Sequence, residues 1–103
     1  MTSIPFKPDM RDAVLAGKKT MTSRSQRYAN GEHFATSQGK KFARIKVTDS
    51  YSTNWEAILN DRFKEEGFES PEQMRAWAVA NSLGHYAQLK TMWTHTFEVL
   101  EKL

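Results

Sequence analysis

Residues 17–24 read Gly-Lys-Lys-Thr-Met-Thr-Ser-Arg and bring several chemically capable side chains together. This short segment carries two ammonium groups, three hydroxyls and a guanidinium. A hydroxyl becomes a nucleophile only beside a base, and a lysine becomes a base near neutral pH only when burial lowers its pKa. The segment can therefore support hydrolysis if the fold buries it. The ordinary alternative is a solvated lysine pair followed by a threonine-rich strand.

Other common catalytic chemistries lack their residues in this sequence. There is no cysteine, which excludes thiol nucleophiles, thiolate zinc sites and disulfide frameworks. The three histidines, His33, His85 and His95, lack the close spacing of a zinc motif. Neither a glycine-rich phosphate loop nor a Gly-x-Ser-x-Gly nucleophile motif is present. We therefore expect any hydrolysis to proceed without a metal or another cofactor.

Charge is distributed unevenly along the 103 residues, whose length fits one domain over 1–103. Lysine and arginine outnumber aspartate and glutamate by ten to four in residues 1–53, whereas residues 54–103 carry five against eight. A basic half indicates an anionic partner, although the same charges also serve as an ordinary solvated surface. No apolar run approaches the roughly 18 residues of a membrane span, and the first residues lack a signal-peptide pattern. We expect a cytoplasmic protein with no membrane partner.

Hydrophobic periodicity and capping residues predict seven elements in the order β-α-β-β-α-α-β. This order favours an α+β domain built on a small curled sheet. Residues 27–38 are predicted to be a loop with a turn at Asn30-Gly31. The predicted elements are a strand over 4–6, a helix capped by Asp9 and ending near Gly17, strands over 19–24 and 41–48, a helix from the capping box 53–56 to Phe63, a helix from the capping box 70–73 to Gly84, and a strand over 93–99.

Strand geometry limits how the residues of segment 17–24 can meet. Side chains alternate across a strand, so Thr22 and Arg24 share one face and Lys19 falls on the other. Lys19 and Thr22 converge only if Lys19 precedes the strand or a bulge intervenes. A glycine at position 17 favours an irregular start to the strand.

The same segment resembles the G-x-K-x-x-T-x-R signature of ASCH domains, which have a PUA-like β-barrel fold. The resemblance extends along nearly the whole chain and includes Phe6-Lys7, the helix ending at Gly17, the strand over 41–48, residues 65–68 and the final strand with Phe97-Glu98. It implies a small PUA-like (ASCH) β-barrel with flanking helices.

Within that family the chain looks most like the bacterial N4-acetylcytidine amidohydrolases. The resemblance implies a metal-independent hydrolase with Lys19, Thr22 and Glu66 as its catalytic residues, and N4-acetylcytidine or related N4-acylated cytosines as its substrate. Glu66 is preferred over Glu65 because it directly precedes Gly67-Phe68. Two stretches, 27–41 and 84–92, look longer than in those enzymes and could reshape the mouth of a pocket.

Two mechanisms stay open for the implied catalytic set. Either Lys19 is desolvated strongly enough to act as the base for Thr22, or Lys19 stays charged and Glu66 activates water. Arg24 is a candidate for binding a pyrimidine carbonyl or a ribose oxygen. The aromatic residues Phe6, Tyr28 and Phe34 are candidates for stacking on the base, with core packing as their alternative. The tryptophans Trp55, Trp77 and Trp93 are predicted to be core residues.

An RNA-binding PUA-like module, or a single-stranded RNA ribonuclease, is the alternative function. PUA-like domains in general bind RNA, and the basic first half suits phosphate contacts. A nucleoside hydrolase needs one closed pocket, whereas an RNA binder needs a long basic groove. The two functions therefore predict different surfaces around the basic residues.

Overall fold

A single curled sheet of five strands organises the structure, a computed structural model that describes all residues 1–103. The strand order is β1-β3-β4-β5-β2, so β1 and β2 form the two edges. β1 runs parallel to β3, and every other pair is antiparallel. The strands are β1 (Ser3–Pro5), β2 (Met21–Arg24), β3 (Gly31–Ser37), β4 (Lys40–Thr53) and β5 (Met92–Lys102).

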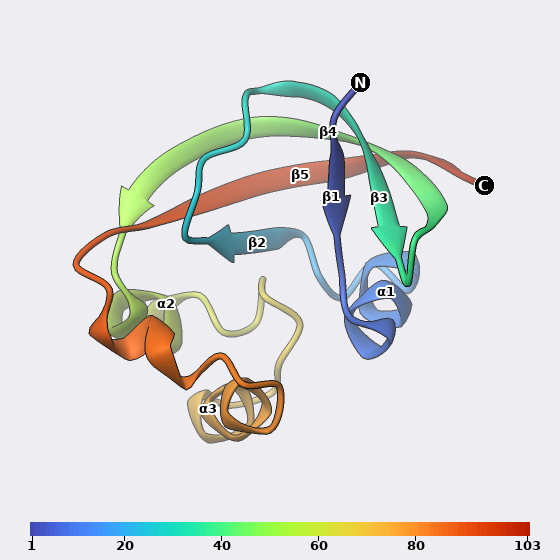
Figure 1. Ribbon diagram of the computed structural model, residues 1–103. Helices are drawn as coiled ribbons and strands as arrows, with labels where there is room; N and C mark the ends of the chain where they lie inside the picture. Colours follow the sequence, from blue (N-terminus) through green and yellow to red (C-terminus); the bar gives the residue numbers. More distant parts are fainter.

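The two longest strands, β4 and β5, give the sheet its shape. They pair along nearly their full lengths and form a long arch over the rest of the chain (Figure 1). Their register shifts between Arg44 and Ile45 and again between Val47 and Asp49. Bulges of this kind bend a strand and increase its twist, which curls the sheet into a half-barrel.

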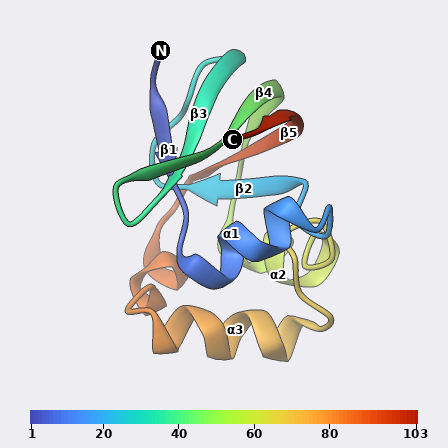
Figure 2. The same ribbon diagram turned by 90° about the vertical axis from the view of Figure 1, so that its right-hand side faces the viewer.

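The helices lie beneath this arch (Figures 1 and 2). α1 (Pro8–Leu15) connects β1 to β2, whereas α2 (Trp55–Asp61), α3 (Pro71–Ala80) and the 3-10 helix η1 (Gly84–Gln88) all lie between β4 and β5. None of these helices is long and apolar enough to cross a membrane. The connection between β4 and β5 therefore supplies most of one side of the molecule.

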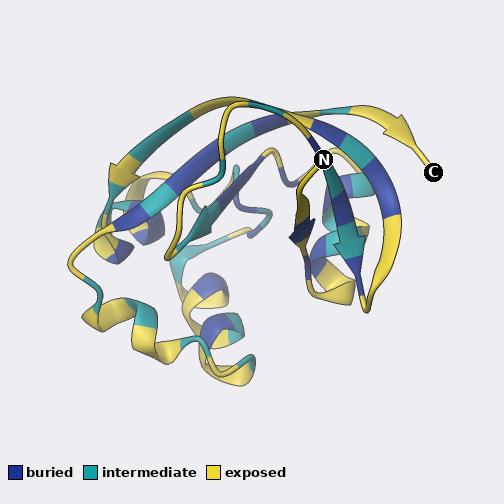
Figure 3. Cartoon of the chain, turned by 45° about the horizontal axis from the view of Figure 1, so that its top comes forward, coloured by how far each residue is buried: buried dark blue, intermediate teal, exposed yellow.

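The core lies between the inner face of the sheet and the helices. Ala43, Ile45 and Val47 are fully buried, as the alternation in this segment predicts. Buried stretches of β4 and β5 lie along the middle of the arch, whereas the C-terminal end of β5 is exposed (Figure 3). The helices contribute Met10 and Val14 from α1, Trp55, Ile58 and Leu59 from α2, and Met74 and Ala78 from α3.

The prediction of an α+β fold is confirmed, but one strand was missed. Most of the predicted loop over 27–38 is β3. Its inward positions are His33, Ala35 and Ser37, so polar and small residues occupy the places where a strand usually shows large apolar ones. The true order is therefore β-α-β-β-β-α-α-β, with η1 before the last strand.

Two predicted helix starts are also wrong. α1 begins at Pro8 after Lys7, and the Asp9 carboxylate instead accepts a hydrogen bond from the indole of Trp77 at 2.6 Å. β4 continues through Thr53, so Asn54 caps α2 by accepting from the amide of Ala57. The Ser70 cap of α3 is confirmed, since its hydroxyl accepts from the Gln73 amide at 3.1 Å.

Truncation of the core beneath the arch should destabilise the fold strongly. Ile45→Ala removes a fully buried side chain and should lower the free energy of unfolding by about 2–5 kcal/mol. The matched control is Val79→Ala on α3, whose side chain is 68% exposed and which should change stability by less than about 0.5 kcal/mol. Urea denaturation measures both values, and equal effects would contradict this assignment of the core.

Candidate active site

A cavity of about 430 Å³ opens between the sheet edges and the helices. Most of its polar groups come from residues 19–24 and from the turn after α2, and its apolar groups come mainly from the helices. The volume falls within the range of ordinary small-molecule sites. The lining residues are Pro5, Phe6, Lys7, Pro8, Met10, Lys19, Thr22, Ser23, Arg24, Gln38, Trp55, Glu66, Phe68, Met74, Trp77, Leu83 and Tyr86.

A buried ion pair between Lys19 and Glu66 forms the centre of the polar region. The Lys19 ammonium donates to the Glu66 carboxylate oxygen Oε1 at 2.9 Å and to the Glu66 main-chain carbonyl at 2.8 Å. Only 5% of Lys19 and 3% of Glu66 are exposed to solvent. Lysine and glutamate are almost never buried unless paired, and here each is the other's charge partner.

Main-chain hydrogen bonds hold the two partners of this pair together. The amides of Thr20 and Met21 both donate to the carbonyl of Glu65, at 2.8 and 3.1 Å. The start of β2 is thereby fastened to the turn that carries Glu66. Lys19 itself lies two residues before β2, which satisfies the condition under which its side chain and that of Thr22 can reach one cavity.

Gly67 permits this close approach. Its φ of +104° belongs to the region that favours glycine, and a Cβ at this position would lie 3.3 Å from Cβ of Lys19. The backbone conformation therefore favours glycine after Glu66, and the space left for a side chain there is tight.

Burial lowers the pKa of the Lys19 ammonium below its ordinary value of 10.5. Desolvation is the largest cause and exceeds the opposing effect of Glu66, which raises the pKa by its charge and its hydrogen bond. Arg24 lowers it slightly further, and Asp9 raises it slightly. A lysine in this environment gives up its proton more readily than an exposed one, as a general base must.

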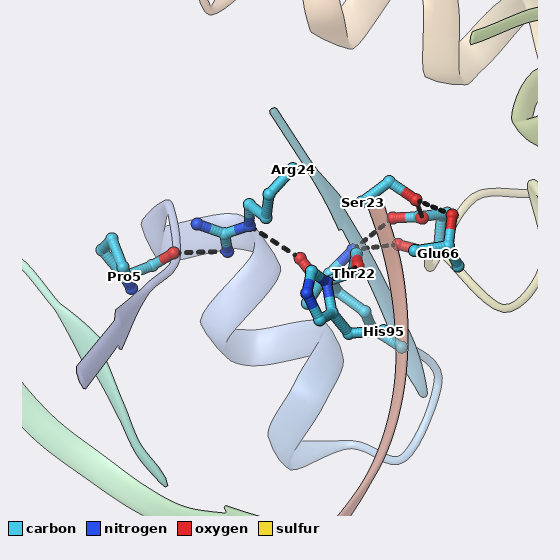
Figure 4. Close-up of polar contacts among 8 residues, drawn as sticks. Pro5, Thr22, Ser23, Arg24, Glu66 and His95 are labelled. Atoms are coloured by element: carbon cyan, nitrogen blue, oxygen red, sulfur yellow. Dashed lines mark hydrogen bonds and ion pairs between the residues drawn. The ribbon is translucent and has the colours of Figure 1, made fainter. Parts of the chain in front are cut away.

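Arg24 joins the two edges of the curled sheet. Its Nε donates to the hydroxyl of Thr22 at 2.9 Å, and Nη2 donates to the carbonyl of Pro5 in β1 at 2.5 Å (Figure 4). The guanidinium also lies over the ring of Phe6, 5.0 Å from its centroid. Burial lowers the Arg24 pKa from its usual value. These contacts place a cationic donor on the Thr22 oxygen, where it would stabilise an alkoxide.

His95, in β5, fixes the backbone of Thr22. The amide of Tyr28 donates to His95 Nε2 at 2.8 Å, so the proton of the neutral ring lies on Nδ1, which donates to the Thr22 carbonyl at 3.0 Å. Burial lowers the pKa of His95 and keeps the ring neutral. Sequence reasoning dismissed the histidines as metal ligands and had no signal for this role.

Ser23 also enters the site, although no sequence signal singled it out. Its hydroxyl donates to Glu66 Oε2 at 2.5 Å and lies 2.9 Å from the hydroxyl of Thr94 (Figure 4). The hydroxyl that touches the carboxylate is thus that of Ser23. The Thr22 hydroxyl contacts Arg24 and makes no hydrogen bond to Lys19 or Glu66.

The structure gathers most of the predicted site residues into one cavity. Lys19, Thr22, Glu66, Arg24 and Phe6 all line it.

Two predicted binding residues lie elsewhere. Tyr28 packs edge-on against His33 and His95, with ring centroids 5.9 and 5.5 Å apart, and Phe34 lies 4.1 Å beneath the ammonium of Lys41. Phe34 lies in β3, so its expected place in a loop is wrong, whereas Tyr28 does lie in the loop before β3. Neither residue lines the cavity.

Aromatic residues from the helices and from the segment before α3 line the cavity instead. Trp55, Phe68, Trp77 and Tyr86 line it. The tryptophan predictions are therefore only partly right, because two of these core-face residues also border the cavity; Trp93 is half-buried beneath Arg27. Helical periodicity identifies an apolar face but not whether that face meets another side chain or a cavity.

No three of the histidine, aspartate and glutamate side chains lie close enough together to hold a metal ion.

Similarity to solved structures identifies the fold class. No protein-family model matches the sequence, and no curated protein matches it. The ASCH protein from Zymomonas mobilis aligns with a TM-score of 0.68 at 13% identity, over 97% of this chain and 68% of that one. The ASCH domain from Lactobacillus crispatus JV V101 aligns with a TM-score of 0.63 at 15% identity, over 90% and 71%. The chain therefore has the ASCH-type, PUA-like fold, a curled half-barrel with three α-helices.

Substitution of Gly67 should disturb the site through its backbone. Gly67→Ala forces a side chain into a positive-φ conformation against Lys19 and should cost about 1–3 kcal/mol of unfolding free energy. Gly84→Ala is the matched control, because Gly84 has no positive φ and a Cβ there would meet nothing within 4 Å. Thermal and urea unfolding compare the two variants; a Gly67→Ala protein as stable as Gly84→Ala would refute this role.

Proposed function

We propose that the protein is a metal-independent amidohydrolase that cleaves the acyl amide of N4-acetylcytidine and related N4-acylated cytosines. The observation that carries the proposal is the buried Lys19–Glu66 pair, placed with Thr22 and Arg24 on one small-molecule-sized cavity. The ASCH-type fold and the resemblance of residues 17–24 to the amidohydrolase signature support the same assignment.

The substrate's chemistry matches such a site. Hydrolysis requires attack on the acyl carbonyl and departure of the exocyclic amine of cytosine. That amine is delocalised into the ring, which makes it a better leaving group than an alkyl amine. The reaction then needs a nucleophile, a group that carries a proton and a donor for the oxyanion.

In the proposed mechanism Thr22 attacks and Lys19 carries the proton. The reactive form is the one in which Lys19 has lost its ammonium proton, which the lowered pKa favours. The Thr22 hydroxyl proton passes to this neutral amine as the Oγ1–carbon bond forms. The tetrahedral intermediate then collapses, the carbon–N4 bond breaks, and N4 takes the proton from the Lys19 ammonium. Water then attacks the threonyl ester as Lys19 accepts one of its protons. The carbon–Oγ1 bond breaks, and Oγ1 takes that proton back from the Lys19 ammonium, which releases the carboxylic acid and restores the Thr22 hydroxyl and the Lys19 amine. The lowered pKa of Lys19 supports this route over water activated by Glu66.

The remaining groups have binding roles in the proposal. Nη1 of Arg24 makes no hydrogen bond within the protein, so it is available to a substrate oxygen such as the pyrimidine carbonyl. Phe6 and the aromatic side chains of α2, α3 and η1 offer surfaces for a flat ring.

Removal of the ion pair should abolish hydrolysis. Either single substitution would leave a buried charge unpaired, which costs about 3–5 kcal/mol, so the informative variant is the double substitution Lys19→Met with Glu66→Gln. It should lower kcat/KM for N4-acetylcytidine at least about 10²-fold, because the proton carrier is lost. Release of cytidine is followed by chromatography, and circular dichroism verifies the fold.

The neighbouring pair provides the control. Lys18 is exposed and the Glu65 side chain makes no hydrogen bond, so Lys18→Ala with Glu65→Gln should retain near-normal activity. Normal turnover by the Lys19 and Glu66 double variant would show that the pair is not catalytic. If the wild type hydrolyses no N4-acylcytidine but binds RNA with strong salt dependence, the RNA-binding alternative is correct.

Thr22 variants distinguish the nucleophile. Thr22→Ser keeps the hydroxyl and should remain active, whereas Thr22→Val should lose at least about 10²-fold in kcat. Thr20→Val, at an exposed position on the same segment, is the control and should be unaffected. Mass spectrometry of a quenched reaction would detect the acylated wild type. Substantial turnover by Thr22→Val would instead identify water as the nucleophile.

A further inference from the structure

We propose that Ser23, supported by Thr94, is a positioning residue that holds the Glu66 carboxylate in register with Lys19. The inference rests on the proposed function, and it adds two hydroxyls that lie outside the Lys-Thr-Arg signature.

The direction of each hydrogen bond follows from the donors available. Glu66 Oε2 is an acceptor when the carboxylate is ionised, so Ser23 donates its hydroxyl proton to it across 2.5 Å. The Ser23 oxygen is then free to accept, and the Thr94 hydroxyl donates to it across 2.9 Å. A chain of two hydroxyls therefore ends on the carboxylate oxygen that Lys19 does not contact.

The register of the sheet fixes the position of these two hydroxyls. Ser23 in β2 is paired directly with Thr94 in β5, and Thr94 is fully buried. Cross-strand serine and threonine pairs of this kind interact through their hydroxyls. Ser23 thus reaches Glu66 from a rigid element, whereas Glu66 lies in a turn between α2 and α3. The strand positions the carboxylate of the turn.

The other charged groups around Glu66 cannot replace this contact. The Lys19 ammonium is bound to Oε1, and the Arg24 guanidinium is bound to Thr22 and Pro5. The His95 ring is neutral, and both of its nitrogens are hydrogen-bonded to other residues. Asp9, on α1, acts on Lys19 as a further negative charge. Ser23 is the only group hydrogen-bonded to Oε2, and without it that buried oxygen loses its donor.

For catalysis, the consequence is that the Glu66 carboxylate keeps the Lys19 ammonium in a fixed position. Both carboxylate oxygens are held, one by Lys19 and one by Ser23, so the carboxylate has no freedom to rotate away from the ammonium. The Lys19 nitrogen is thereby kept at one place in the cavity, from which it exchanges a proton with the nucleophile. Displacement by about 1 Å is enough to reduce an enzymatic rate substantially.

The test compares Ser23→Ala, Ser23→Thr and Thr94→Val with wild type, using N4-acetylcytidine hydrolysis and crystal structures of each protein. Ser23→Ala should lower kcat about 10-fold with KM nearly unchanged, because alignment and not binding is lost. Ser23→Thr keeps the hydroxyl and should restore kcat. Thr94→Val should add little to Ser23→Ala in the double variant, because Thr94 acts through Ser23. Ser25→Ala, at an exposed neighbouring position, is the control and should match wild type.

The crystal structures report on the same claim without reference to activity. In Ser23→Ala the Glu66 carboxylate should leave its position beside Lys19, and in Ser23→Thr it should keep it. A Ser23→Ala protein with wild-type kcat, or with its Glu66 carboxylate in place, would overturn the inference. Absence of turnover by the wild type would refute the proposed function alone, and the position of Glu66 in Ser23→Ala would then decide the role of Ser23.

Discussion

Burial of a lysine and a glutamate against each other is the constraint on which the site depends. Removing two charges from water costs several kcal/mol each, and the cost is recovered only with close geometry and satisfied hydrogen bonds. Here the Lys19 ammonium has two acceptors on Glu66, and the carboxylate has donors on both oxygens. Because removal of either partner would leave a buried charge, the surrounding backbone has to hold both in place.

Backbone contacts around Lys19 and Glu66 hold the two side chains in place. The carbonyl of Glu65 accepts from two amides at the start of β2, and Gly67 allows the turn to approach Lys19 closely. On the other side, Arg24 connects β2 to β1 and His95 fixes the Thr22 carbonyl. A curled sheet whose edges approach each other, with helices beneath, therefore leaves a cavity bordered by the pair.

Local patterns predicted the helices, the buried face of β4 and the Ser70 cap because each depends on neighbouring residues. Resemblance of residues 17–24 and Glu66 to a known signature associated Lys19 with Glu66, which the structure pairs across 47 residues of sequence and which no local pattern could associate. Strand β3 was missed because His33 and Ser37 occupy its inner face. The hydrogen bonds of Ser23, His95 and Trp77 join them to residues far away in the sequence, so periodicity held no signal for these contacts.

The protonation of Lys19 tests the central claim most directly. In an NMR titration of lysine side chains labelled with 13C, the Lys19 signal, assigned by its absence from the Lys19→Met and Glu66→Gln double variant, should show a pKa below the ordinary 10.5. Because Glu66 raises that pKa, the Lys19 signal in Glu66→Gln should titrate at still lower pH. A Lys19 signal that titrates together with the exposed lysines in both proteins would contradict the account, since it would show that burial does not prepare this amine to act as a base.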